Sequence, residues 1–263
     1  GSDLEIFATG LRNPQELAFD QYGNLFTDDN DTAGEDKSRF IYVVEGGDYG
    51  WRASYQFMDG YGPWIQEKNW MGGIDGTLPL SGEVSQGPSG LAFYPGTGLP
   101  EKYQNHFFGC DFPKGIWSFA VQPKGAGYEV VDKEKFLWNL GATDVDFAPD
   151  GSVYALDWGL SYSMPNSGRI YRVFDPESRG SRDDEAHPNS LSVKNLLADG
   201  MKKRSVEELA KLLGHADQRV RMDAQFELVA RTFASTSQNS FPQRAEREIN
   251  LLVQISKSSK SPS

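Results

Sequence analysis

The sequence predicts a mainly β region followed by an all-α region, and three observations support this division. Short runs of β-branched and aromatic residues, bounded by Gly, Asp or Pro, fill the part before residue 179. That part carries a net charge of −14 and 30 of the 33 aromatic residues. The remainder carries a net charge of +3, and its apolar residues recur at helical spacing. We therefore expect two domains of different chemistry.

The domain boundaries follow from the change in composition. We place the β domain at residues 3–178, a linker at 179–190, a helical segment at 191–256 and a disordered tail at 257–263. The linker is polar, charged and nearly free of large apolar side chains. The tail reads KSSKSPS, which has too few apolar groups to bury.

A weak internal repeat organises the β domain. Its copies begin at Asn13, Gly87 and Gly141 and read NPQELAFDQYGNLFTDD, GPSGLAFYPGTGLPEKYQNHFFGCD and GATDVDFAPDGSVYALDW. Each copy has an apolar-x-Phe strand, a turn rich in Gly, Pro or Asp, and a second strand, and GIWSFAV and GRIYRV suit third strands. Small sheets that are apolar on both faces must be buried between neighbours, as the blades of a β-propeller are. Residues 52–84 are irregular and rich in Gly and aromatic residues, so we expect a long insertion over one face of the propeller.

The second region has three predicted helices. Ser205 and Glu208 form a capping box for the first, and Asp217 caps the second. Residues 242–256 form the third, with Pro242 at its first position. The apolar faces of the first two helices are assigned to Val206, Leu209, Leu212, Leu213, Val220, Ala224, Phe226 and Leu228. The stretch LLGHADQRVRMDAQFEL is similar to a HEAT-type repeat.

Composition excludes several classes of function. The net charge of −11 argues against a general nucleic-acid binder, which needs a basic face. No apolar run is long enough to span a bilayer. One cysteine, Cys110, excludes an internal disulfide framework, a cysteine-based zinc site and a CxxCH haem site within this chain.

The stretch GLRNPQELAFD, the acidic loop after it and the turn GGDYGW together resemble the soluble quinoprotein glucose/sorbosone dehydrogenase family. The resemblance covers about residues 4–174, and the helical tail is similar to a planctomycete-type multidomain subgroup that joins a propeller to HEAT-like repeats. It implies a six-bladed propeller, of which the three repeats would be about half. It also implies binding of pyrroloquinoline quinone (PQQ) and calcium, and oxidation of sugars at C1.

The resemblance assigns the PQQ-binding residues. It places Arg12 and Asn13 against the quinone, where a fixed guanidinium would stabilise the reduced anion. Ser85 and, with a shift of one residue, Lys114 fall at two further positions of the family. The family's last blade opens with two arginines that hold cofactor carboxylates, and here residues 141–144 read Gly-Ala-Thr-Asp. The alternative is that Arg12 pairs with a carboxylate and Asn13 only starts a strand.

The acidic loop after the first repeat is a candidate calcium site. Carboxylates crowded in one loop are tolerated by a hard cation with oxygen ligands or by full solvation, and both readings stay open. By resemblance the backbone carbonyls of two loop residues contact the ion, a carboxylate ends the loop, and a tyrosine lies near a second metal position. The resulting set is Asp28, Asp29, Asp31, Thr32, Asp36 and Tyr49. Lys37 replaces the second carboxylate of a family pair.

The resemblance assigns no catalytic residue to this chain. The family's base is a histidine in the half of the propeller that precedes Arg12, and His106, His187 and His215 suit structural or solvated roles. Trp158 and Tyr162 suit either a sugar platform or packing between blades. Half a propeller exposes apolar faces, so we expect the chain to pair with an N-terminal half or a second copy, and to be inactive alone.

Two functions are therefore expected to compete. The first is a periplasmic or extracellular dehydrogenase that takes a sugar or polysaccharide-derived substrate and passes electrons to an acceptor such as a c-type haem domain. Its reaction would be hydride transfer from the sugar C1 to the quinone. The second is a non-catalytic propeller that binds carbohydrate or protein, with the helical repeats as a docking surface.

Overall fold

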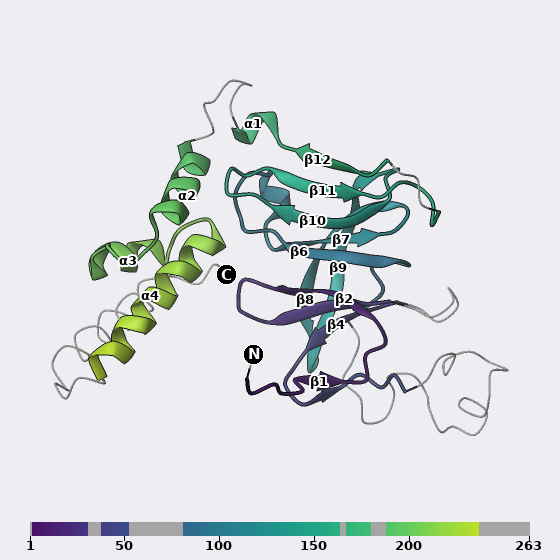
Figure 1. The fold of residues 1–263 in the computed structure, drawn as a ribbon, viewed down its shortest axis with the longest axis horizontal. Helices are drawn as coiled ribbons and strands as arrows, with labels where there is room; N and C mark the ends of the chain where they lie inside the picture. Colours follow the sequence, from purple (N-terminus) through teal and green to yellow (C-terminus); the bar gives the residue numbers. More distant parts are fainter. Residues whose placement is uncertain (1, 31–37, 53–80, 164–166, 180–187, 237–263) are drawn as a thin grey trace. The chain divides into compact units, whose positions relative to one another are not determined.

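A computed structural model of the chain describes residues 2–30, 38–52, 81–163, 167–179 and 188–236 (Figure 1). It forms two compact units, here named the strand unit and the helical unit. The strand unit comprises residues 1–94, 100–148 and 152–173, and the helical unit comprises residues 95–99, 149–151 and 174–263. The predictions for 242–256, for 257–263 and for most of 52–84 fall outside the described residues.

Three antiparallel sheets stack on one another in the described part of the strand unit (Figure 1). The first sheet consists of β2 (Pro14–Phe19), β3 (Leu25–Asp29) and β4 (Arg39–Val43). The second consists of β6 (Pro88–Phe93), β7 (His106–Asp111), β8 (Gly115–Lys124) and β9 (Gly127–Trp138). The third consists of β10 (Ala142–Phe147), β11 (Val153–Asp157) and β12 (Arg169–Val173). A fourth, small parallel sheet pairs β1 (Ala8–Thr9) with β5 (Gly47–Asp48), and a single 3-10 turn, η1, spans Glu101–Tyr103.

The mainly β prediction is confirmed, and so is the role of the repeats. Each copy supplies the first two strands of one sheet, and GIWSFAV and GRIYRV lie in β8 and β12. Strands in chain order within each sheet, and sheets packed face to face, are consistent with part of a propeller. The long strand β9 and the pair β1–β5 were not predicted.

The middle sheet is covered on both faces. Neighbouring residues of a strand point to opposite sides, so Phe107 and Phe108 in β7 face different neighbours. The ring of Phe107 lies 5.0 Å from Phe26 in the first sheet, and the ring of Phe108 lies 5.0 Å from Phe147 in the third. Every residue of β7 is buried as a result. Large edge-to-face aromatic contacts thus hold the three sheets together.

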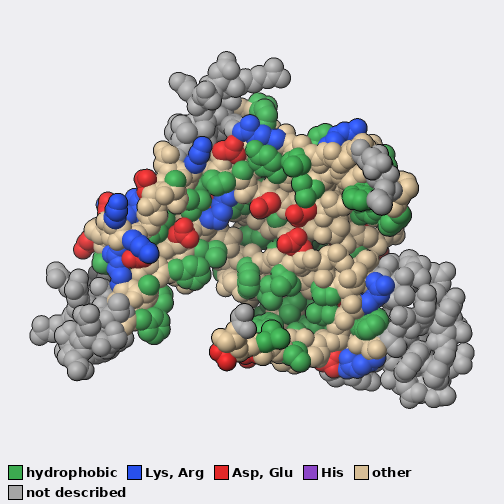
Figure 2. Space-filling view, viewed as in Figure 1, with side chains coloured by type: hydrophobic (Ala, Val, Ile, Leu, Met, Phe, Trp, Pro, Cys, Tyr) green, Lys and Arg blue, Asp and Glu red, His purple; other side chains and the backbone are tan. Residues whose placement is uncertain are grey.

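The outer faces of the first and third sheets are more open. Leu17 and Phe19 in β2, and Leu156 and Ile170 in the third sheet, are exposed. Figure 2 shows hydrophobic side chains, in green, reaching the surface over the strands. In β11, buried and exposed residues alternate, which is typical of a sheet with one open face.

The helical unit contains α1 (Pro176–Arg179), α2 (Pro188–Asp199), α3 (Val206–Leu212) and α4 (Gln218–Thr236). The predicted capping box is present: Glu208 N donates to Ser205 Oγ at 3.1 Å, and Ser205 N donates to the Glu208 carboxylate at 2.7 Å. The predicted apolar faces of α3 and α4 meet in one cluster with Val193 and Met201, except that Phe226 is 60% exposed and that assignment was wrong. A HEAT-type identity of this unit stays a prediction. None of the described helices is long and apolar enough to cross a membrane.

Within the helical unit, Asp217 links α4 to the turn at residues 95–99. Its carboxylate accepts from Arg219 N at 2.9 Å, which caps α4 as predicted, and from Thr97 Oγ1 at 2.6 Å. Gln218 N donates to Pro95 O at 2.7 Å. The start of α4 is therefore held by backbone and side-chain bonds to the same short turn.

We predict that Phe26→Ala lowers the free energy of unfolding by about 3–5 kcal/mol, because Phe26 is fully buried between the first and middle sheets. Phe19→Ala is the matched control, since Phe19 is 55% exposed in the same sheet and should cost less than about 1 kcal/mol. Urea denaturation of both variants measures the difference. Equal losses would contradict the packing of the sheets through this cluster.

Candidate functional site

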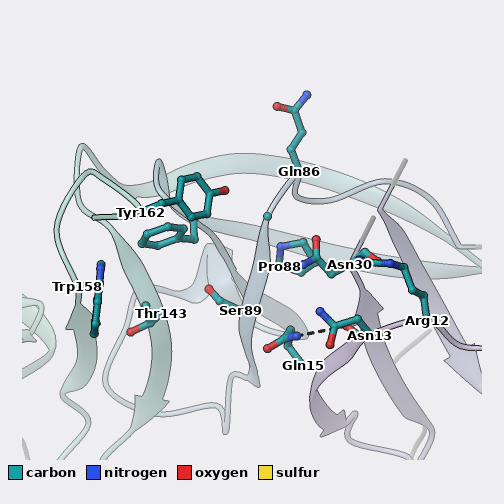
Figure 3. A pocket seen from close by; sticks show the side chains of 12 residues that line it. Arg12, Asn13, Gln15, Asn30, Gln86, Pro88, Ser89, Thr143, Trp158 and Tyr162 are labelled. Carbon is teal, nitrogen blue, oxygen red and sulfur yellow. Dashed lines mark hydrogen bonds between the residues drawn. The ribbon is translucent and has the colours of Figure 1, made fainter. Parts of the chain in front are cut away.

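A pocket of about 550 Å³ lies where the first strand of each of the three sheets begins and the second strand ends (Figure 3). All three repeats therefore contribute side chains to it. The lining residues are Arg12, Asn13, Gln15, Asn30, Gln86, Gly87, Pro88, Ser89, Phe112, Thr143, Trp158 and Tyr162. The lining combines one guanidinium, four side-chain amides and two aliphatic hydroxyls with three aromatic rings, one of them the phenol of Tyr162. This combination suits a polar ligand that has a flat face.

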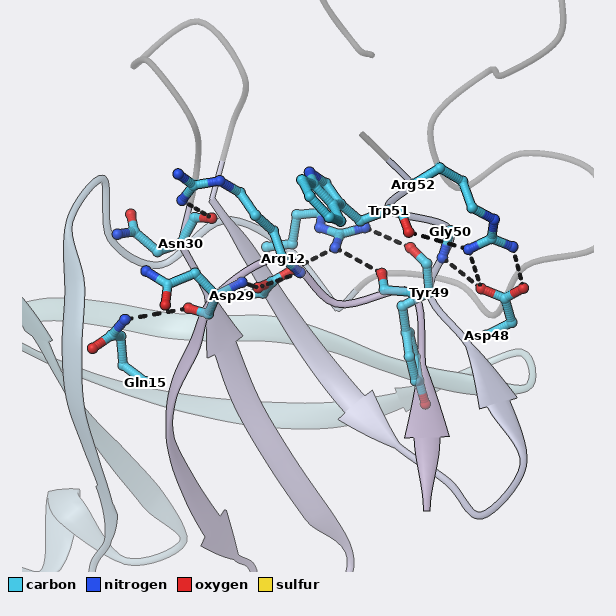
Figure 4. A network of polar contacts seen from close by, with 12 residues as sticks. Arg12, Gln15, Asp29, Asn30, Asp48, Tyr49, Gly50, Trp51 and Arg52 are labelled. Atoms are coloured by element: carbon cyan, nitrogen blue, oxygen red, sulfur yellow. Dashed lines mark hydrogen bonds and ion pairs between the residues drawn. The ribbon is translucent and has the colours of Figure 1, made fainter. Parts of the chain in front are cut away.

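The predicted residues Arg12 and Asn13 both line the pocket. The backbone holds them in place, because Arg12 N and Asn13 N donate to the carboxylate of Asp29 at 3.0 and 2.6 Å (Figure 4). The Arg12 guanidinium donates to Asn30 O at 3.1 Å, so it lies along the rim of the pocket. The amide of Gln15 reaches back to Asn13 O at 3.5 Å.

Trp158 and Tyr162 lie on the opposite side of the pocket, beyond Thr143 (Figure 3). The Tyr162 ring contacts the Phe112 ring edge-on at 5.0 Å between centroids. Both Trp158 and Tyr162 are exposed, so their ring faces are accessible to a ligand. This placement is compatible with the sugar platform that the sequence suggested as one of two roles.

Ser85 and Lys114 do not line the pocket. Ser85 is buried, and its hydroxyl donates to Asp28 at 2.6 Å. Lys114 Nζ donates to the side-chain oxygen of Gln86, which does line the pocket, and lies 3.6 Å from Asp111. A direct role of either residue in holding a cofactor stays a prediction.

The predicted metal ligands are spread over different environments. Asp31, Thr32 and Asp36 lie outside the described residues. Asp29 forms an ion pair with Arg39, whose guanidinium also donates to Gly10 O and Tyr49 O (Figure 4). The Tyr49 hydroxyl donates to Tyr42 O at 2.6 Å and accepts from Val44 N at 2.9 Å. Among the described residues, no three His, Cys, Asp or Glu side chains gather in a way that could hold a metal ion.

Asp28 is the carboxylate whose environment stands out in the predicted metal set. It is buried, and its Oδ1 atom has no hydrogen-bond partner among the described residues. The pKa of Asp28 is raised to about 7, mainly by burial; the hydrogen bond from Ser85 and the charge of Lys133 act to lower it, and the carboxylates of Asp111 and Asp29 add to the rise. A partly protonated carboxyl at neutral pH, or one that gains a cation, would suit this position.

Residues 141–144, where the resemblance expects two arginines, contain no cationic side chain. Thr143 is the one residue of that stretch in the pocket lining. Asp144 follows it, and burial together with the Asp144 carboxylate raises the pKa of Glu16. This side of the pocket therefore carries negative charge nearby, whereas Arg12 supplies positive charge on the other side.

Several lining residues were missed at the level of sequence, and a signal for two of them, Asn30 and Phe112, was present; Trp158, which the sequence did single out, carries the same signal. Asn30, Phe112 and Trp158 each directly follow the aspartate that ends the second strand of a repeat, in TDD, GCD and ALD. The equivalent place in each repeat therefore predicts a pocket residue. Gln15, Gln86, Ser89 and Thr143 have no such marker. No histidine lines the pocket in the described part of the chain.

We predict that the stability of the protein falls as pH rises through the range set by Asp28. Because the pKa of Asp28 is raised in the folded state, the folded protein keeps this proton between about pH 4 and 7, whereas the unfolded chain has lost it. The free energy of unfolding therefore falls as pH rises across this window. Asp28→Asn should remove that loss, worth at most about 4 kcal/mol. Urea denaturation across this window, with a chelator to remove calcium, measures it. Asp132→Asn, at an exposed position, is the control, and a pH-independent difference between Asp28→Asn and wild type would contradict the prediction.

Comparisons with known proteins concern both sequence and fold. The family model described as glucose/sorbosone dehydrogenase matches residues 1–162. Curated protein sequences give no significant match. A crystal structure of a glucose dehydrogenase matches with a TM-score of 0.52 and 24% identity, over 65% of this chain and 47% of that one.

Two further solved structures have lower scores. The soluble aldose sugar dehydrogenase of Escherichia coli in its apo form gives a TM-score of 0.46 at 21% identity, covering 64% of this chain and 46% of that one. The PQQ-bound form of aldose sugar dehydrogenase from Streptomyces coelicolor gives 0.42 at 18% identity, covering 64% and 44%. The chain thus spans less than half the length of these three proteins.

The family match includes the whole lining of the pocket. It covers more than half of the chain and includes each of the twelve lining residues, from Arg12 to Tyr162. Its N-terminal part contains the Arg-Asn pair, and its end coincides with the aromatic side of the pocket. The chain therefore belongs to the glucose/sorbosone dehydrogenase family.

Proposed function

We propose that this chain supplies part of the cofactor- and substrate-binding face of a sugar dehydrogenase that depends on PQQ and calcium. The observation that carries the proposal is the pocket itself, which brings the Arg12–Asn13 pair and the Trp158–Tyr162 pair to the same end of three stacked sheets. A charged or amide-rich wall facing an aromatic wall suits an anionic planar cofactor with a sugar beside it.

The pocket residues fit PQQ in donors and in size. Arg12, the side-chain amides and the hydroxyls can hydrogen-bond carboxylate and quinone oxygens, and about 550 Å³ accommodates a ligand of that class. The described lining supplies one cation, Arg12, whereas three carboxylates call for more positive charge. Binding should therefore be weak without calcium, which would supply the remaining charge.

Each part of the pocket then has a distinct task. When bound, the quinone would supply a hydride acceptor for the sugar C1. The Arg12 guanidinium would stabilise negative charge at its rim, and the amide of Asn13 would donate a hydrogen bond next to it. The Trp158 ring would pack against the apolar face of a sugar ring. The base, the substrate identity and an acceptor such as a c-type haem domain belong to the whole protein, for which we propose a periplasmic or extracellular location.

A second function is favoured by a specific observation. The stretch from Gly141 to Asp144 offers no cation, while aromatic rings and amides remain in the lining. This combination also suits carbohydrate binding without redox chemistry. The two proposals differ in whether PQQ binds, so one titration separates them.

We predict that the purified chain binds PQQ saturably in the presence of calcium and more weakly with a chelator. Arg12→Gln should weaken binding roughly tenfold to hundredfold, because it removes a charge-assisted hydrogen bond donor. Arg172→Gln is the control, since Arg172 in β12 donates to Ser152 and does not line the pocket. Quenching of intrinsic tryptophan fluorescence provides the readout. No PQQ binding by wild type, with or without calcium, would remove the dehydrogenase proposal in favour of the binding module.

We predict that Trp158→Ala weakens binding of glucose or an oligosaccharide about tenfold, because the sugar loses its stacking partner. Tyr154→Ala is the control, because Tyr154 is an exposed aromatic residue of β11, the strand that Trp158 directly follows, and lies outside the pocket. Isothermal titration with and without PQQ measures the effect. A platform role is contradicted if both variants bind like wild type.

A further inference from the structure

Three buried aspartates occupy the same place in the three stacked sheets. Asp29, Asp111 and Asp157 are the last residues of β3, β7 and β11, and at most 6% of any of them is exposed. Each lies opposite the first residue of the preceding strand, namely Pro14, Pro88 and Ala142. In all three sheets the register shifts immediately after that pair.

Each carboxylate accepts hydrogen bonds from two backbone N–H groups near the pocket. Asp29 accepts from Arg12 N and Asn13 N. Asp111 Oδ1 accepts from Gln86 N and Gly87 N, both at 3.1 Å. Asp157 Oδ1 accepts from Gly141 N and Gly159 N, both at 2.9 Å.

A cationic side chain accompanies each aspartate, and it is the first residue of the next strand or, for Lys114, the residue just before it. Arg39 pairs with Asp29, Lys114 Nζ lies 3.6 Å from Asp111, and Arg169 Nη1 lies 3.5 Å from Asp157. The second oxygen of Asp111 also accepts from Trp117 Nε1 at 3.0 Å. A carboxylate that is compensated in this way can be buried and can still accept hydrogen bonds from the backbone.

The N–H groups that these carboxylates hold lie outside the strands, before the first strand of each sheet or, for Gly159, after the second. No ladder partner is therefore available to them there, and the aspartate carboxylate serves as their acceptor. The amides held by Asp29 and Asp111 belong to pocket residues themselves. The amides held by Asp157 flank Thr143 and Trp158, which also line the pocket.

We propose that Asp29, Asp111 and Asp157 are positioning residues that set the three walls of the pocket independently, one wall for each sheet. Asp29 holds the Arg12–Asn13 wall, Asp111 holds the Gln86–Gly87 wall, and Asp157 holds the segments that carry Thr143 and Trp158. The identity of the ligand rests on the proposed function, whereas the positioning of the pocket walls by the three aspartates does not depend on it.

Hydrogen exchange of the full-length chain tests the independence of the walls. Asp111→Asn should speed exchange of the Gln86 and Gly87 amides roughly tenfold to hundredfold and leave those of Gly141 and Gly159 unchanged. Asp157→Asn should do the reverse. Asp132→Asn, which removes the same charge at an exposed position, should change neither wall. Faster exchange at both walls in each variant, or at neither, would overturn the proposal.

Wild-type exchange provides a test that does not depend on variants that fold. The amides of Arg12, Asn13, Gln86, Gly87, Gly141 and Gly159 should all be protected, although each lies outside a β-strand. Fast exchange at these amides would contradict the proposal.

Ligand titrations then separate this proposal from the function of the pocket. With PQQ and glucose as probes, Asp111→Asn and Asp157→Asn should weaken whichever ligand the wild type binds by about tenfold, while the rest of the fold keeps its exchange rates. A wild type that binds neither probe refutes the proposed function, and the exchange data alone then decide whether the aspartates position the walls. Unchanged affinity in variants with a loosened wall would contradict positioning of a binding site.

Discussion

The strand unit depends on the burial of its middle sheet from both sides. A small twisted sheet that is apolar on both faces gains stability only when both faces are covered, and β7 achieves this with Phe107 on one side and Phe108 on the other. The first and third sheets are each covered by the middle one, and their far faces keep exposed side chains such as Phe19 and Ile170. The described strand unit therefore keeps exposed apolar side chains on both outer faces of the stack.

Stacking in this manner also creates the pocket. Because the three sheets share one topology, the entries of their first strands and the ends of their second strands meet at one end of the unit. The residue after each second strand, Asn30, Phe112 or Trp158, then faces the same space. Repetition of a single local arrangement produces a composite site, in which no sheet alone supplies both the guanidinium and the aromatic rings.

The sequence predicts the parts of this fold that local chemistry determines. The repeats, two third strands, the Ser205 capping box and the Asp217 cap depend on neighbouring residues and are recovered. Strand β9 was missed because it is a charged edge strand, whose pairing with β8 rather than its own pattern keeps it extended. Phe226 was misassigned because helical spacing shows which residues share a face and not whether another element covers that face. Pocket residues such as Thr143 come together through packing between sheets, which no local pattern encodes.

The charge distribution of the pocket limits how a ligand can lie in it. Arg12 provides positive charge on one side, while Asp144 and Glu16 follow the lining residues Thr143 and Gln15 on their strands. An anionic group would be attracted towards Arg12 and repelled from the carboxylates of Asp144 and Glu16. Salt screens charge–charge interactions little over distances this short. A cofactor with several carboxylates would therefore place one of them at Arg12. Its least charged edge would then face Trp158, which is the side that the proposed function gives to the sugar.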